Sequence, residues 1–249
     1  MKRSICVLFV LHLLVSCNNN QPQYAEVVAT NAWTAAYALA AGATDVRVLT
    51  PYEMTHPSEY ELRPGDITHL NNAEIIIYAG YEVMMEQIRS GLKIPDEKML
   101  QIYTSYNMDE IENSVMQIAR KLGTGELALK NLDEIRESLE NAQKVVAESG
   151  LENSPAVVHF FQQSFVEEAG IEILDVFGPA PPEPRQILEM TQTDAALIID
   201  NAHNPSGGAL RETMPEKEYV VLLNFPGAHD TRTLEDVIEY NTNQLQSLR

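Results

Sequence analysis

Residues 126–148, ELALKNLDEIRESLENAQKVVAE, decide the fold that we expect for this chain. Apolar side chains recur in this segment at spacings of three and four residues, and charged residues stand between them. This pattern predicts one long amphipathic helix with a single apolar face. The apolar positions are Leu129, Leu132, Ile135, Leu139, Ala142 and Val146.

The sequence on the N-terminal side of this helix alternates between short apolar runs and helical patterns. Asn31 can cap the first helix, Asp66 can cap the second, and Gly123 ends the third. We expect strands at 26–30, 46–49, 75–78 and 99–103, and helices at 32–41, 67–72 and 108–122.

The same alternation resumes after Gly150. We expect strands at 156–158, 171–176, 195–199 and 219–223, and helices that end near 169, 192 and 245. Strands that alternate with helices predict parallel sheets with crossover helices. The expected architecture is therefore α/β, with an N-terminal lobe (24–125), a connecting helix (126–148) and a C-terminal lobe (149–249), and with a ligand cleft between the lobes.

The N-terminus has the organisation of an export signal. Lys2 and Arg3 precede the apolar run Ile5–Val15, which has about 11 residues and is too short for a membrane span of roughly 20. The run ends at Leu-Val-Ser-Cys17, which resembles a bacterial lipobox. We expect a signal peptide at 1–16, lipidation of Cys17, a tether at 17–23, and a protein anchored by lipid that faces the periplasm or the cell exterior.

The composition excludes several classes of protein. The formal net charge of −19 disfavours direct binding to nucleic acid or to an anionic bilayer surface. Cys6 and Cys17 are the two cysteines, so no disulfide framework is expected. Ser206 lacks the strand–turn–helix context of a nucleophile elbow, and no H-E-x-x-H segment occurs, so we do not expect an enzyme.

Three blocks of sequence resemble the metal-binding solute-binding lipoproteins of ABC transporters, the zinc and manganese type known as cluster A-I. They are YELRPGD with NAEIIIYAG (60–66 and 72–80), VVHFFQQSFVEEAGI with VFGPAPPEP (157–171 and 176–184), and TLEDVIEYN (233–241). The resemblance implies two lobes joined by a rigid helix and a divalent ion held between them. It also implies delivery of the ion to an ABC permease and its ATPase by a monomeric binding protein.

The metal site departs from the pattern of that family. The family's four ligand positions fall at Ser58, near Tyr103, at His159 and near Asn224, so His159 alone keeps a ligand in register. A histidine at this position favours zinc over manganese. One hypothesis is a rebuilt metal site made of His159, His56, Asp200 and His203, with Glu59, His229 and Asp230 nearby and with Ser58, Glu59, Tyr103 and Asn224 as residues of the cleft.

The alternative hypothesis is that the fold is kept but the usual metal site is lost. The ligand is then a metal chelate or a small organic molecule. Aromatic and amide side chains would line its cleft, as such sites often require. The candidates for this lining are Trp33, Tyr52, Tyr78, Tyr103 and Asn224.

Overall fold

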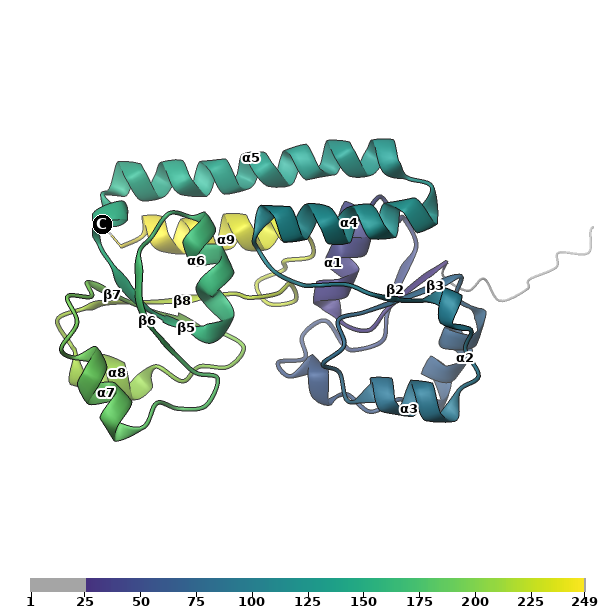
Figure 1. The fold of residues 1–249 in the computed structure, drawn as a ribbon, viewed down its shortest axis with the longest axis horizontal. Coiled ribbons are helices and arrows are strands. Elements are labelled where there is room, and N and C mark those ends of the chain that lie inside the picture. Colours follow the sequence, from purple (N-terminus) through teal and green to yellow (C-terminus); the bar gives the residue numbers. More distant parts are fainter. Residues whose placement is uncertain (1–25, 249) are drawn as a thin grey trace, which may run out of the picture.

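The computed structural model describes residues 26–248. Two α/β lobes lie side by side, and one long helix runs across both of them (Figure 1). This arrangement confirms the predicted fold class. The expected signal peptide, the lipidation site Cys17 and the tether 17–23 lie outside the described residues.

The N-terminal lobe is built on a parallel four-stranded sheet in the order β2-β1-β3-β4. β1 and β3 lie at the centre, and every residue of both strands is buried, which explains their unbroken apolar sequence. The elements are β1 (Val27–Ala29), α1 (Ala32–Ala40), β2 (Val46–Val48), α2 (Pro64–Asn72), β3 (Ile75–Tyr78), α3 (Met84–Gly91), β4 (Met99–Gln101) and α4 (Met108–Leu122).

The C-terminal lobe repeats this topology with the order β6-β5-β7-β8, again all parallel. In both lobes the central pair of strands contains the point at which the strand order reverses, and ligands of such sheets bind at the carboxyl ends of these strands. The elements are β5 (Ala156–His159), α6 (Gln163–Glu168), β6 (Ile173–Phe177), α7 (Pro184–Met190), β7 (Leu197–Asn201), α8 (Gly208–Thr213), β8 (Glu218–Leu222) and α9 (Leu234–Gln246).

The long helix α5 (Gly125–Ser149) confirms the helix predicted at 126–148. It packs against α4 of the N-terminal lobe and α9 of the C-terminal lobe, and α9 also contacts α1, so one apolar core continues from lobe to lobe. The buried face differs from the prediction at one position. Leu129 is 53% exposed, and Ala128 is buried in its place.

A second tie between the lobes lies at the start of α4. The Glu168 carboxylate of α6 accepts hydrogen bonds from the side chain of Asn107 and from the backbone N–H of Met108, each at 2.9 Å. Ser164 accepts the backbone N–H of Tyr106 at 3.1 Å. The N-terminus of α4 is therefore capped in part by residues of the other lobe.

Some local expectations need correction. Asp66 does not cap a helix at 67–72; it lies at the third position of α2, where its carboxylate accepts the backbone N–H of Arg63 and the hydroxyl of Tyr60, both at 2.8 Å. The helices α3 and α8 were not expected. Both are short, and the burial of Met84, Met85 and Ile88 in α3 depends on the sheet beneath them.

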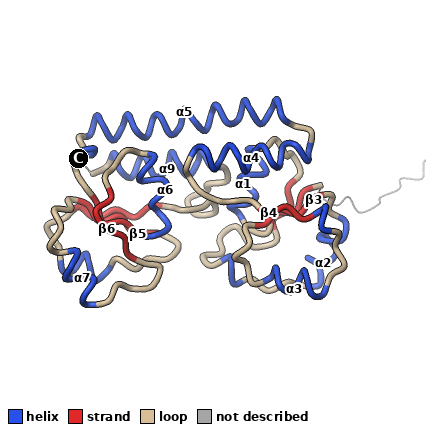
Figure 2. The backbone as a smooth tube through the Cα atoms, in the orientation of Figure 1, coloured by secondary structure: helices blue, strands red, loops and turns tan. Residues whose placement is uncertain are grey.

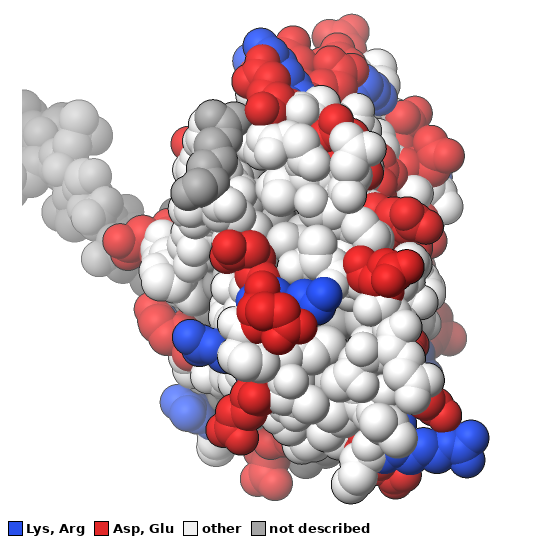
Figure 3. All heavy atoms as spheres, turned by 90° about the vertical axis from the view of Figure 1, so that its left-hand side faces the viewer, with Lys and Arg blue, Asp and Glu red and all other residues white. Residues whose placement is uncertain are grey.

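Loops face one another where the two lobes meet below α4 and α9 (Figure 2). Seen from the side of the C-terminal lobe, the surface carries more carboxylate than basic side chains (Figure 3), which agrees with the negative charge of the whole chain. No helix within residues 26–248 is long and apolar enough to cross a membrane.

Candidate functional site

The cavity between the two lobes has a volume of about 420 Å³. The N-terminal lobe contributes α1, the loop before α2 and the turn after β3, and the C-terminal lobe contributes the turns after β5, β7 and β8. All of these turns follow the carboxyl ends of strands, where α/β proteins bind ligands. The lining residues are Trp33, Thr55, His56, Pro57, Ser58, Glu59, Tyr81, Phe161, His203, Asn204, Asn224 and Phe225.

His203 is the best-oriented imidazole of this interlobe cavity. Its Nδ1 lies 2.8 Å from Oδ1 of Asn224, and its ring stacks on Phe225 with the centroids 3.6 Å apart. The amide oxygen accepts, so Nδ1 carries the proton and donates. Nε2 is then the unprotonated nitrogen, whose lone pair can bind a metal ion.

His203 is neutral at physiological pH. Burial lowers its pKa to about 4; the hydrogen bond with Asn224 opposes this shift, and the nearby His56 and His229 add to it. A neutral imidazole is the form that binds transition metals, so His203 needs no proton release at neutral pH to act as a ligand.

His56 also lines the interlobe cavity, together with its neighbours Ser58 and Glu59. His56 and Glu59 are exposed at the rim, and the 3₁₀ turn Pro57–Glu59 holds this loop. Five of the candidate residues therefore meet at one cavity: His56, Ser58 and Glu59 from one lobe, and His203 and Asn224 from the other.

His159 has a different environment. It is fully buried at the end of β5 and is not among the residues that line the interlobe cavity. Its Nδ1 accepts the backbone N–H of Phe161 at 3.1 Å, so in the neutral ring the proton lies on Nε2. Burial lowers the pKa of His159, and the Asp200 carboxylate opposes this effect. In this conformation neither nitrogen of His159 offers a free lone pair to an ion in the cleft.

Asp200 is fully buried and organises the turn after β7. Its Oδ1 accepts the backbone N–H groups of Asn201 and Ser206, and its Oδ2 accepts that of Gly207 and the hydroxyl of Tyr219. With four donors on its two oxygens, the carboxylate shapes the segment that carries His203.

The remaining candidates lie in other cavities. Tyr103 is 70% exposed and lines a cavity of about 550 Å³ that shares Trp33, Tyr81 and Phe161 with the interlobe cavity. Tyr52 lines a third cavity between the lobes, of about 590 Å³, together with His203 and His229.

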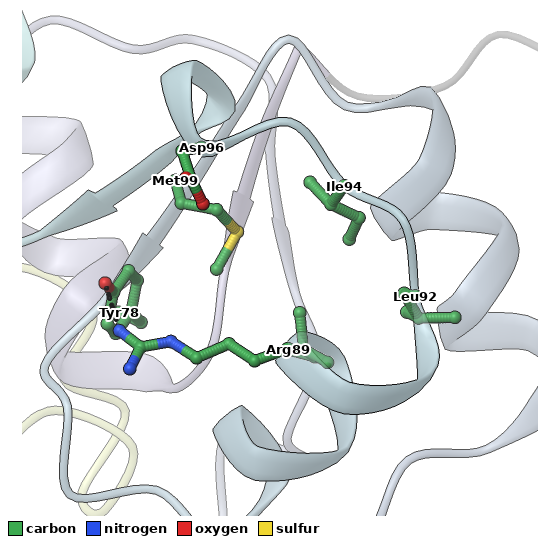
Figure 4. Close-up of a pocket in the computed structure, with 7 residues that line it drawn as sticks. Tyr78, Arg89, Leu92, Ile94, Asp96 and Met99 are labelled. Carbon is green, nitrogen blue, oxygen red and sulfur yellow. Dashed lines mark hydrogen bonds between the residues drawn. The ribbon is translucent and has the colours of Figure 1, made fainter.

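Tyr78 does not face the cleft, contrary to the sequence-based expectation. It lines a separate cavity in the N-terminal lobe with Leu92, Ile94, Asp96 and Met99 (Figure 4). Arg89 lies over its ring and donates a hydrogen bond to its hydroxyl at 2.8 Å. Tyr78 therefore packs within its own lobe.

Tyr81, Phe161 and Phe225 are residues of the cavity that the sequence did not single out. Each follows the carboxyl end of a predicted strand by one to three residues, and this position was the available signal. Within residues 26–248, no three His, Cys, Asp or Glu side chains come close enough to hold one metal ion. The cavity thus combines two imidazoles with aromatic walls.

Comparisons with known proteins support the fold. No protein-family model and no curated protein matches the sequence. Among solved structures, the SBP FpvC from Pseudomonas aeruginosa in complex with Ni²⁺ aligns with a TM-score of 0.70 and 17% identity, over 91% of this chain and 97% of that chain. Its complex with Mn²⁺ gives a TM-score of 0.69 at 16% identity, over 91% and 98%.

A Mn-bound periplasmic metal binding protein from Candidatus Liberibacter asiaticus aligns with a TM-score of 0.65 and 13% identity, over 90% of this chain and 99% of that chain. At such low identities the likeness concerns the fold. The chain has the same two-lobed architecture as these metal-bound proteins, over nearly their whole length.

Proposed function

We propose that this protein is an extracytoplasmic solute-binding protein that captures a divalent metal cargo between its lobes and delivers it to an ABC permease and its ATPase. The observation that carries the proposal is the pairing of His203 with Asn224 at the interlobe cavity. It presents a neutral imidazole with its Nε2 lone pair unprotonated. The fold shared with metal-bound binding proteins supports the same conclusion.

The proposed ligands from the chain are His203 and His56, and Glu59 is the acidic side chain that lines the same cavity. His159 and Asp200, which the sequence also suggested, do not line the cavity in this conformation. We propose that they support the site, because their hydrogen bonds fix the turns that bear Phe161 and His203. Imidazole ligands favour zinc over manganese, so we propose zinc as the preferred ion among these two.

The proposed location follows from the N-terminal sequence. Cleavage before Cys17 and lipidation of this residue would tether the protein to the membrane by its lipid alone, facing the periplasm or the cell exterior. We propose a monomer that has no nucleic-acid partner, because its charge is strongly negative.

We propose binding without a catalytic step. His159, Asp200 and Ser206 lie near one another, but Nδ1 of His159 accepts the amide of Phe161, and Asp200 accepts backbone N–H groups. The imidazole therefore lacks the Nδ1–H to carboxylate hydrogen bond that orients the base of a catalytic triad.

Isothermal titration calorimetry with Zn²⁺, Mn²⁺ and Ni²⁺ tests the proposal. We expect a stoichiometric site and a loss of at least tenfold in affinity in His203→Ala. His69→Ala is the matched control, because His69 lies on α2 and lines a cavity away from His203. If neither a bare ion nor a chelated one binds more tightly than about 10 μM, equivalent to about −7 kcal/mol, the proposal is wrong.

A further inference from the structure

The interlobe cavity is too large for a bare ion. A zinc ion with its nitrogen ligands at about 2.0–2.1 Å would occupy only a small part of this cavity. The cavity of about 420 Å³ instead lies within the range of small-molecule sites, which is roughly 300–1,000 Å³. Two further cavities share His203 or Trp33 with it, so the space between the lobes extends beyond a single chamber.

The walls of this cavity are aromatic on both sides. Trp33 and Tyr81 come from the N-terminal lobe, and Phe161 and Phe225 come from the C-terminal lobe. Tyr81 is 51% exposed and Phe161 is 37% exposed, so both rings are accessible to a ligand in the cleft. Such faces bind planar rings by stacking, with centroids about 4.5–7 Å apart.

The coordinating groups of the chain are incomplete. His203 and His56 line the cavity, but no group of three His, Cys, Asp or Glu side chains gathers within residues 26–248. A divalent ion bound here must therefore bring some of its donors with it. Phe225, which stacks on His203 at 3.6 Å, places an aromatic surface directly beside the metal-binding nitrogen.

We propose that the cargo is a divalent metal ion already held by a small aromatic chelator. The chelator's ring stacks between Tyr81 and Phe161, and Nε2 of His203 replaces one water molecule on the metal. This inference rests on the proposed function and defines its substrate class. It explains why the aromatic walls and the reduced set of ligands occur in the same cavity.

The test compares three probes by calorimetry on the purified chain: Ni²⁺ alone, its 1:1 complex with 2,2′-bipyridine, and its 1:1 complex with ethylenediamine. Both chelators are neutral, bidentate nitrogen donors, so the two complexes have equal charge and the same number of open coordination positions. We expect the bipyridine complex to bind at least tenfold more tightly than the other two probes. Mass spectrometry of the eluted ligand should recover bipyridine and nickel in equal amounts.

Substitutions in the cavity distinguish stacking on the chelator from coordination of the metal. Phe161→Ala should weaken binding of the bipyridine complex at least fivefold, whereas Leu188→Ala, an exposed apolar residue of α7 that lines neither cavity, should not. His203→Ala should abolish the preference for the complex over free bipyridine. Circular dichroism and thermal unfolding verify that the variants fold.

The possible failures are distinguishable. If Ni²⁺ or its ethylenediamine complex binds as tightly as the bipyridine complex, the inference is wrong and the proposed function stands. If free bipyridine binds as tightly as its nickel complex, coordination by His203 is not part of recognition, and the inference is also wrong. If no metal probe binds more tightly than about 10 μM, the proposed function fails together with the inference.

Discussion

The carboxyl ends of the two sheets form two rims that face each other, and they satisfy their polar groups differently. In the N-terminal lobe, Glu82 is buried and accepts hydrogen bonds from the side chains of Thr30 and Asn31 and from the backbone N–H groups of Ala79 and Gly80. This one carboxylate joins the turns after β1 and β3. Glu82 therefore satisfies the polar groups of these two turns with a single side chain.

The rim of the C-terminal lobe has a similar anchor in Asp200, but several of its buried polar atoms have no hydrogen-bond partner. Buried atoms without a hydrogen-bond partner are costly and need an explanation. Four such atoms of the described chain lie on this rim, at the ends of β5 and β7 or shortly after them. They are His159 Nε2, Gln162 Oε1, Asn201 Nδ2 and Ser206 Oγ. On the N-terminal rim the corresponding atoms are fewer, Trp33 Nε1 and Thr50 Oγ1, so the C-terminal rim offers more buried polar atoms that a ligand or ordered water could satisfy.

The largest expected effect comes from removing the two anchors. Asp200→Ala and Glu82→Ala should each lower the free energy of unfolding by about 3 kcal/mol, because each leaves several buried donors without an acceptor. Urea unfolding measures this loss, with the exposed Glu134→Ala as a control that should change it by less than about 0.5 kcal/mol. At a temperature where both variants are folded, Asp200→Ala should weaken cargo binding more than Glu82→Ala. Equal weakening would remove the distinction between the rims.

The two rims touch at a glycine, and its replacement should have the next largest effect. A Cβ added at Gly227, which has a φ of +129°, would lie 2.0 Å from the backbone oxygen of Tyr52 in the other lobe. Gly227→Ala should cost about 2–3 kcal/mol in thermal or urea unfolding, because both the backbone and the contact are strained. Gly123→Ala is the matched control, since Gly123 also has a positive φ but open space around it, and should cost about 1 kcal/mol. Similar losses in both variants would argue against a tight contact between the rims.

The pH dependence of stability should reflect His203. Its folded-state pKa of about 4 lies below the ordinary value of 6.5, so between these values the unfolded chain binds a proton that the folded chain does not. The free energy of unfolding should therefore fall as the pH decreases from 6.5 to 4, by up to about 1.4 kcal/mol per unit. His203→Gln should flatten this slope in urea titrations at several pH values. An unchanged slope would show that His203 is not buried as a neutral ring.

The smallest effect tests Asn224 as a positioning residue. Asn224→Leu removes the acceptor of His203 Nδ1 and should weaken metal binding about tenfold, as expected for the loss of a group that orients a ligand. Asn224→Asp restores an oxygen acceptor and should recover most of the affinity in calorimetry. If the leucine variant binds as well as the parent chain, the orientation of His203 does not depend on this pair.

Most of the architecture could be predicted from the sequence. Periodic apolar positions gave α5, and Gly123 ends α4 in the left-handed conformation as expected. Leu129 fits the helical period but is exposed, because neither lobe covers this side of the helix, and α3 was missed because its few apolar residues are buried only by the sheet.

The candidate site was only partly accessible from the sequence. The resemblance identified Asn224, and His203 was identified as an imidazole near the expected cleft. Their hydrogen bond links residues 21 positions apart and depends on β7 lying beside β8. The resemblance correctly placed His159 at the end of a strand. It could not show that the imidazole accepts a hydrogen bond from the backbone amide of Phe161. The aromatic walls come from α1 and from three different turns, and only the folded lobes bring them together.

The bonds of Glu168 to the start of α4 have a kinetic consequence. Together with α5, they fasten the two lobes along one whole side, so wide separation of the lobes would require the first turn of α4 to fray. We therefore expect cargo to enter and leave on the opposite side, past the loop that carries Tyr52, His56 and Glu59. The residence time of the cargo would then depend on local motion of one loop.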